Sequence, residues 1–145
     1  MDLRSSGQTG VALANAYRLD GWEVTLVAGP TDHPLPSWAE IKPVSSAQEM
    51  AEAVKAEFER ADLLVMVAAV ADFRPATKSK EKIKSSREMR SIELLPNPDI
   101  LAECSRSRKR GQAVIGFALV SENVIANARE KLQSKGCDLL VVNNP

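Results

Sequence analysis

Residues 62–75 read DLLVMVAAVADFRP, and this stretch decides the fold of the chain. Its first half is uninterrupted and apolar, which predicts a strand over residues 62–67 that is buried on both faces. Its second half brings one acid, Asp72, to the carboxyl end of that strand, and a lysine-rich loop follows over residues 78–84. Open α/β sheets bind phosphorylated ligands at this edge. We therefore expect an α/β protein with an anion site at the carboxyl end of a buried strand.

Strands and helices alternate along the rest of the chain. Apolar spacing predicts helices over residues 9–19, 47–58 and 123–135, and a further helix that begins at Pro98, where proline is tolerated in the first turn. Strands are predicted over residues 22–28, 41–44, 91–95, 113–117 and 138–142. Ser45 or Ser46 is expected to cap the second helix, with Glu49 completing a capping box.

This alternation predicts a Rossmann-like, doubly wound and mostly parallel sheet with helices on both faces. One strand is missing from the order, because such a sheet begins with a strand that becomes central, whereas this chain opens on a glycine-rich turn and a helix. We expect residues 1–145 to form a single domain whose first central strand is absent. We interpret it as a fragment of a longer protein, or as a remnant that another chain completes.

Composition narrows the class of protein. The 145 residues are 44% hydrophobic and 26% charged with a formal net charge of +0, so neither a nucleic-acid surface nor a membrane surface is expected. No apolar run has the length of a membrane span and the first residues lack the order of a secretion signal, which predicts a cytoplasmic location. Cys104 and Cys137 are spaced like neither a zinc site nor a redox pair and are expected to be reduced thiols. A lone histidine, His33, does not make a zinc site.

Three motifs in the first two thirds of the chain could bind an anion, and each has a structural alternative. Residues 4–10, RSSGQTG, form a small-residue turn before a helix whose free amides favour an anion. Their spacing is neither a Rossmann fingerprint nor a Walker A loop, so helix capping and close packing explain them as well. Asp72 can accept from ribose hydroxyls or a base, or hold a metal through water, or simply form a turn. Lys82 and Lys84 can place charge on phosphate oxygens or serve solubility.

The last third of the chain adds further candidates. Residues 97–100, NPDI, join a strand exit to a helix start, so the polar members either bind a ligand or cap the helix. Phe117 ends a buried strand at the same edge as Asp72, where it can pack on a base or belong to the core. Lys131 and Lys135 lie four residues apart on one helix face, where they can reach one phosphate chain or stay at the surface.

Together these motifs resemble one known family. AAVAD at 68–72, KIK at 82–84 and NPDI at 97–100 resemble phosphopantothenate–cysteine ligase, the nucleotide-dependent synthetase of coenzyme A biosynthesis. RSSG at 4–7 is similar to a run at the corresponding place in that family, and the resemblance covers nearly all of residues 4–143. It implies that the 4′-phosphopantothenate carboxylate attacks the α-phosphate of CTP, with Mg²⁺ present, to form an acyl-cytidylate and pyrophosphate. Cysteine then attacks the acyl carbon and releases CMP.

The resemblance also implies a set of site residues. The nucleotide would be bordered by Ser5, Ser6, Gly7, Met66, Val67, Ala68, Asp72, Asn97, Pro98, Asp99, Ile100 and Phe117. Its phosphates would be held by Lys82, Lys131 and Lys135, and Lys82 is the implied catalytic residue, while no side chain is assigned as a direct metal ligand. The family often carries a flavin-dependent decarboxylase domain in the same chain, and its C-terminal strands form a homodimer.

Several features depart from the family pattern, among them Ser85, which cuts short the family's lysine run after Lys84. Leu3 stands where the family has an asparagine tied to the acyl intermediate, and residues 116–121, GFALVS, lack the family's acid. A non-catalytic nucleotide-binding module is therefore the alternative function, and the sequence does not separate CTP from ATP. A nicotinamide-dependent oxidoreductase is less well supported, since the chain has no glycine fingerprint and no Tyr-x-x-x-Lys pair.

Overall fold

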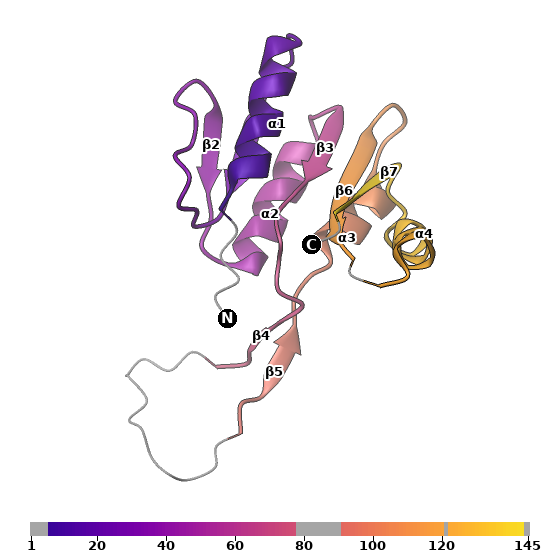
Figure 1. Ribbon diagram of the computed structural model, residues 1–145. Coiled ribbons are helices and arrows are strands. Elements are labelled where there is room, and N and C mark those ends of the chain that lie inside the picture. The colour runs from indigo at the N-terminus through magenta and orange to yellow at the C-terminus, as the bar shows by residue number, and fades with distance from the viewer. Residues whose placement is uncertain (1–5, 78–90, 121, 144–145) are drawn as a thin grey trace.

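A computed structural model describes residues 6–77, 91–120 and 122–143, in which helices and strands alternate (Figure 1). The helices are α1 (Gln8–Leu19), α2 (Ala47–Phe58), α3 (Ile100–Ser107) and α4 (Val124–Lys135). The strands are β1 (Thr25–Ala28), β2 (Glu40–Pro43), β3 (Leu63–Met66), β4 (Phe73–Pro75), β5 (Leu94–Pro96), β6 (Ala113–Leu119) and β7 (Leu139–Asn143). Every predicted element is present, and the structure adds β4. Within the described ranges, no helix combines the length and the apolar character that a membrane crossing requires.

The strands of the main body form two parallel blocks. One block is β1 with β2, and the other is β3, β6 and β7, with β6 in the middle. The strands labelled β2, β3 and β6 point toward the same end of the molecule in Figure 1. The predicted parallel sheet is therefore confirmed, but among the described residues it is divided between β1 and β3.

The remaining two strands correct the prediction for residues 91–95. β5 begins at Leu94 and pairs antiparallel with β4, with Phe73 opposite Pro96, so it does not belong to the parallel series. Figure 1 shows β4 and β5 as an arm that extends from the main body. A segment that returns beside its own outgoing strand pairs antiparallel with it, and apolar composition alone does not distinguish the two kinds of pairing.

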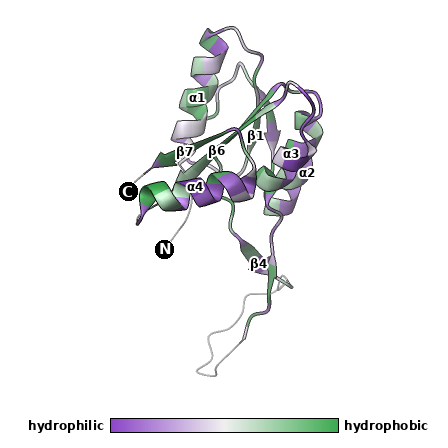
Figure 2. Cartoon of the chain, turned by 90° about the vertical axis from the view of Figure 1, so that its right-hand side faces the viewer, coloured by the Kyte–Doolittle hydropathy of each residue, from purple (hydrophilic) through white to green (hydrophobic). Residues whose placement is uncertain are grey.

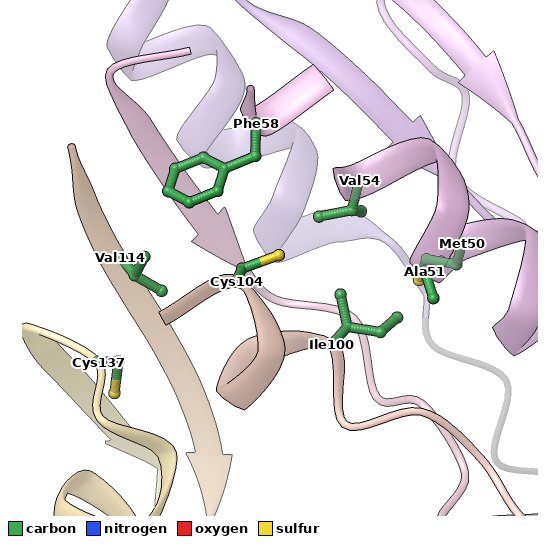
Figure 3. Packing of buried hydrophobic residues seen from close by; sticks show 8 residues of the cluster. All are labelled: Met50, Ala51, Val54, Phe58, Ile100, Cys104, Val114 and Cys137. Carbon is green, nitrogen blue, oxygen red and sulfur yellow. The ribbon is translucent and has the colours of Figure 1, made fainter. Parts of the chain in front are cut away.

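Helices cover both sides of the strands, as predicted. α1 lies on one side, and α2 and α3 lie on the other (Figure 2). The main core fills the second side (Figure 3), and its buried members are Met50, Ala51, Val54, Phe58, Ile100, Cys104, Val114 and Cys137. Both cysteines are free thiols, as predicted. Burial raises the pKa of Cys104 and of Cys137, so neither side chain is activated as a thiolate.

The start of α2 follows the predicted capping pattern. The Ser46 side chain accepts a hydrogen bond from the backbone N–H of Glu49 at 3.2 Å. The Glu49 carboxylate in turn accepts from the backbone N–H of Ser45 at 2.7 Å and from its hydroxyl at 2.8 Å. Two serines thus share the capping box, which satisfies donors at the start of a helix that contributes four residues to the main core.

Helix α3 begins at Ile100 instead of the predicted Pro98, and of the two roles left open for residues 97–100 the structure shows the capping one. Asp99 is its N-cap residue and accepts from the backbone N–H of Ala102 at 3.1 Å, so Ile100 is the first helical residue and Pro98 precedes the cap. The reason is chemical, because a carboxylate can satisfy an N–H of the first turn and a proline ring cannot.

Replacing the cap of α2 should lower stability in a predictable way. We expect Ser46→Ala to lower the free energy of unfolding by about 1 kcal/mol, because the N–H of Glu49 loses its acceptor. Urea unfolding followed by circular dichroism measures this. The control is Ser46→Asp, which keeps an acceptor oxygen and should remain near the wild type. Equal loss in both variants would show that the hydrogen bond is not what stabilises the helix start.

Candidate functional site

A large cavity lies between the two parallel blocks and reaches the carboxyl ends of their strands. Its volume is about 1360 Å³, and its walls include α1, β1, α2, β3 and the segments that follow these strands. Many of the predicted site residues line it: Ser6, Gly7, Met66, Val67, Ala68, Asn97 and Phe117. Segments that are far apart in the sequence thus meet at one place, as expected for an open α/β sheet.

The N-terminal turn is attached to the loop that follows β1. The backbone carbonyl of Ser6 accepts from the Thr31 hydroxyl at 2.6 Å and from the His33 backbone N–H at 3.2 Å. Gly7 has a φ of 74°, and a Cβ placed on it would lie 2.3 Å from Thr31 Oγ1. Only glycine fits here without strain, and the result is a helix N-terminus that borders the cavity, where backbone amides favour an anion.

Asn97 holds the segment after β3 in place. Its side-chain amide donates to the carbonyl of Ala71 at 2.8 Å, and its backbone N–H donates to the carbonyl of Asp72 at 2.8 Å. Arg74 donates from Nη1 to the Asn97 side-chain oxygen at 3.2 Å and also to the carbonyl of Pro96. Asn97 is therefore a positioning residue for the alanine-rich segment that lines the cavity, and Asp72 lies exposed at the base of the arm.

Asp99 and Lys135 form an ion pair between α3 and α4. Burial raises the pKa of Asp99, but the Lys135 ammonium and the Ala102 N–H lower it by more. The net pKa is therefore lowered, and the carboxyl group stays charged at pH values below its ordinary pKa. Lys135 is consequently engaged with a carboxylate in this structure. Lys131 lines a different and smaller hollow of about 400 Å³ beside Glu130. The two lysines share a helix face, as predicted, yet the structure does not bring them into one anion site.

Other predicted residues have different places. Ile100 is only 2% exposed and belongs to the core, and Pro98 lies just before the cap of α3. Leu3, Ser5 and Lys82 lie outside the described residues. Sequence reasoning missed Thr31 and Arg74, which anchor the two cavity segments. No local signal marks them, because their partners are 25 and 23 residues away.

The geometry can be compared with known proteins. A family model described as DNA/pantothenate metabolism flavoprotein C-terminal domain matches residues 1–145. The chain belongs to this family. The resemblance seen in residues 68–72 and 97–100 is thereby confirmed at the level of the family, together with the Rossmann-like fold.

Relatives of the family match the chain over nearly all its length. The coenzyme A biosynthesis bifunctional protein CoaBC of Mycobacterium tuberculosis is 48% identical over 151 residues, which cover 97% of this chain and 36% of that protein. A cysteine/cysteine sulfinic acid decarboxylase from an unknown prokaryotic organism is 43% identical, over 97% of this chain and 39% of that protein. The crystal structure of the C-terminal domain of CoaBC has a TM-score of 0.82 at 35% identity, covering 99% of this chain and 67% of that one. The chain therefore spans well under half of these curated relatives.

Two glycines of the same turn and helix provide a matched test of the N-terminal geometry. We expect Gly7→Ala to lower the free energy of unfolding by at least about 1 kcal/mol, because a left-handed φ and contact with Thr31 both disfavour a Cβ. Gly10→Ala, where nothing lies within 4 Å of the added Cβ, should instead raise it by roughly 0.5–1 kcal/mol through helix propensity. Urea denaturation of both variants measures this. Equal effects of the same sign would contradict the assigned turn.

Proposed function

We propose that this chain is a ligase domain that joins 4′-phosphopantothenate and L-cysteine in coenzyme A biosynthesis, with CTP as co-substrate. The observation that carries the proposal is the convergence of Ser6, Gly7, Ala68, Asn97 and Phe117 on one cavity at the carboxyl ends of parallel strands, which is where such sheets bind nucleotides. The family match over residues 1–145 supports it, as does the name of the Mycobacterium tuberculosis relative.

The cavity suggests a division of roles for the nucleotide. The alanines that follow β3, with Ala68 first, leave room for a planar ring beside Met66 and Val67, and Phe117 on the neighbouring strand can pack against it. The N-terminus of α1, with Ser6 and Gly7, offers backbone amides to a phosphate. We assign Lys82 to the α-phosphate, where a cation stabilises the charge that develops as the phosphopantothenate carboxylate attacks and pyrophosphate leaves.

We expect Mg²⁺ to be held mainly by the phosphates of the nucleotide. Among residues 6–77, 91–120 and 122–143, no group of three or more acidic, histidine or cysteine side chains could hold a metal. Mg²⁺ is commonly held by one or two carboxylates together with substrate phosphates, and Asp72, which is exposed just before β4 and outside the cavity lining, can supply one. The ion would neutralise phosphate charge, and Asp72 would orient it.

Nucleotide binding is tested by calorimetric titration of the chain with CTP and Mg²⁺. We expect binding at or below millimolar CTP, and Asn97→Ala should weaken it by roughly tenfold, because the loss of side-chain hydrogen bonds releases the segment beside the base. The matched control is Asn15→Ala, which also removes a hydrogen bond, to Trp38, but does not line the cavity. No binding of CTP or ATP at millimolar concentration would refute the proposal.

Lys82 is tested by separating binding from chemistry. We expect Lys82→Gln to slow pyrophosphate release by an amount that corresponds to about 2–4 kcal/mol, while CTP affinity changes much less, because its contact strengthens as charge develops. The control is Lys109→Gln, whose ammonium donates to the Glu59 carbonyl at 2.9 Å near the amino end of β6. Wild-type rates of pyrophosphate release in Lys82→Gln would remove the residue from the mechanism.

A nucleotide-binding module without ligase activity is the second candidate. It is favoured by Leu3, which stands where the family has an asparagine, and by the relative named for a decarboxylase that shares this domain at 43% identity. The same two measurements separate the candidates. CTP binding with pyrophosphate release supports the ligase, and CTP binding without it supports the module.

A further inference from the structure

Arg74 is bonded to a residue of the candidate site but does not line the cavity itself. It lies half-buried in β4, at the base of the arm, and the side chains that border the cavity do not include it. Its Nη1 donates to the side-chain oxygen of Asn97 at 3.2 Å and to the backbone carbonyl of Pro96. Asn97 does line the cavity, so Arg74 is placed to act on a bound ligand through this neighbour.

The two ends of the Asn97 amide have partners of opposite kinds. The amide nitrogen donates to the carbonyl of Ala71 at 2.8 Å, and the amide oxygen accepts from Arg74. A carbonyl only accepts and a guanidinium only donates, so these partners select one of the two orientations of the amide. A flipped amide would place oxygen against oxygen at Ala71 and N–H against N–H at Arg74. Without Arg74, one of the two contacts that fix the orientation is lost.

The backbone of Asn97 is already restrained, which leaves its side chain as the adjustable part. Asn97 precedes Pro98, and a residue before proline is restricted to extended backbone conformations. Its backbone N–H also donates to the carbonyl of Asp72 at 2.8 Å. The direction of the amide is then the remaining freedom, and a hydrogen bond from a charged guanidinium is strong enough to restrict it.

The base of the arm depends on Arg74 because its strands share few backbone hydrogen bonds. β4 and β5 form three residue pairs, and two of these contain a proline, Pro75 or Pro96, which has no N–H to donate. A ladder of only two strands is marginally stable in water. Arg74 supplies a side-chain donor to the Pro96 carbonyl, where β5 leads into Asn97. The same guanidinium therefore fixes both the end of β5 and the Asn97 amide.

The alanine-rich segment that Asn97 holds comprises residues 67–71, and all five line the cavity. The segment follows β3 and belongs to no strand. It is held at its start by the pairing of β3 with β6, and at its far end by the hydrogen bonds from Asn97 to Ala71 and Asp72. Three of its five side chains are alanines, which bury little apolar surface. Loss of the far anchor should therefore free this end of the segment.

We propose that Arg74 is a positioning residue for the nucleotide, and that it acts by fixing the Asn97 amide so that residues 67–71 stay where they can border the base. The hydrogen bonds from Arg74 to Asn97, and from Asn97 to Ala71 and Asp72, form what we call the Arg74–Asn97 bridge. The inference rests on the nucleotide site proposed above and adds to it a residue outside the cavity. It requires no contact between Arg74 and the nucleotide.

The test is a double-mutant cycle of Arg74→Met and Asn97→Ala, measured by calorimetric titration with CTP and Mg²⁺. We expect Arg74→Met to weaken CTP binding by about tenfold, as Asn97→Ala does, because each variant breaks the bridge. The double variant should bind no more weakly than Asn97→Ala alone, because Arg74 acts through Asn97. An independent contact between the guanidinium and the nucleotide would instead multiply the two losses to about a hundredfold. Multiplied losses overturn the proposal.

The matched control is Arg108→Met. Arg108 makes the same kinds of bond, to the Gly136 carbonyl at 2.9 Å and to the Asp138 carboxylate at 3.1 Å, but neither it nor these partners line the cavity. We expect its CTP affinity to stay within about twofold of the wild type. A loss equal to that of Arg74→Met overturns the specific role of Arg74. Should Arg74→Met fail to fold, as judged by circular dichroism, Arg74→Gln takes its place in the cycle, because glutamine lacks the charge and is shorter than arginine.

Amide hydrogen exchange of the free protein tests the bridge without nucleotide. We expect Arg74→Met to speed exchange of the Asn97 backbone N–H by at least about tenfold. The N–H of Val44, which donates to the Ala28 carbonyl at 2.9 Å in the other block, should exchange as in the wild type. Unchanged exchange at Asn97 overturns the proposal, with or without an effect on CTP binding. If the wild-type chain binds neither CTP nor ATP, the proposed function fails, whereas faster exchange at Asn97 still supports the role of Arg74 in holding residues 67–71.

Discussion

The packing of α2 across two strand blocks that do not pair with each other is the constraint on which the structure depends. Val27 of β1 and both Leu64 and Met66 of β3 pack against the core cluster that α2 contributes to. Since no backbone ladder joins β1 to β3 among the described residues, side-chain packing on this helix holds the blocks together. The buried face of α2, with Val54 and Phe58, therefore connects the two strand blocks in addition to covering one face of the strands.

Ion pairs on the surface of α2 also connect this helix to its neighbours. Lys55 pairs with Glu103 of α3, and the carboxylate raises the pKa of the Lys55 ammonium. Glu57 lies 3.6 Å from Lys42 of β2. These contacts link α2 to α3 and to β2, and because they are partly exposed they contribute little to stability compared with the apolar core.

The candidate site depends on how the two blocks are placed, because its walls come from both of them. Ser6 and Thr31 belong to the β1 side, whereas Asn97 and Phe117 belong to the β3 side. The packing of α2 against both blocks therefore also sets the distance between these walls. The Asp99–Lys135 pair adds a second condition, since a phosphate that recruits Lys135 must replace a carboxylate partner.

Much of the fold is determined by local sequence. Apolar periodicity and glycine breaks located every predicted helix and strand, and the serines before Ala47 marked a helix start, because these signals act between residues that are close in the chain. The family resemblance implied that Ala68, Asn97 and Phe117 border one ligand, and all three line the same cavity, although Asn97 follows β5, which is not part of the parallel series.

Tertiary structure decided what depends on distant partners. The antiparallel pairing of β5 with β4 and the engagement of Lys135 with Asp99 each follow from contacts between elements that residue spacing does not encode. The sequence did not identify Thr31 and Arg74 as anchors for the same reason, because their partners are distant in the chain. The cavity between the two strand blocks is likewise visible only in the packed structure, because burial and backbone pairing are properties of the assembled chain.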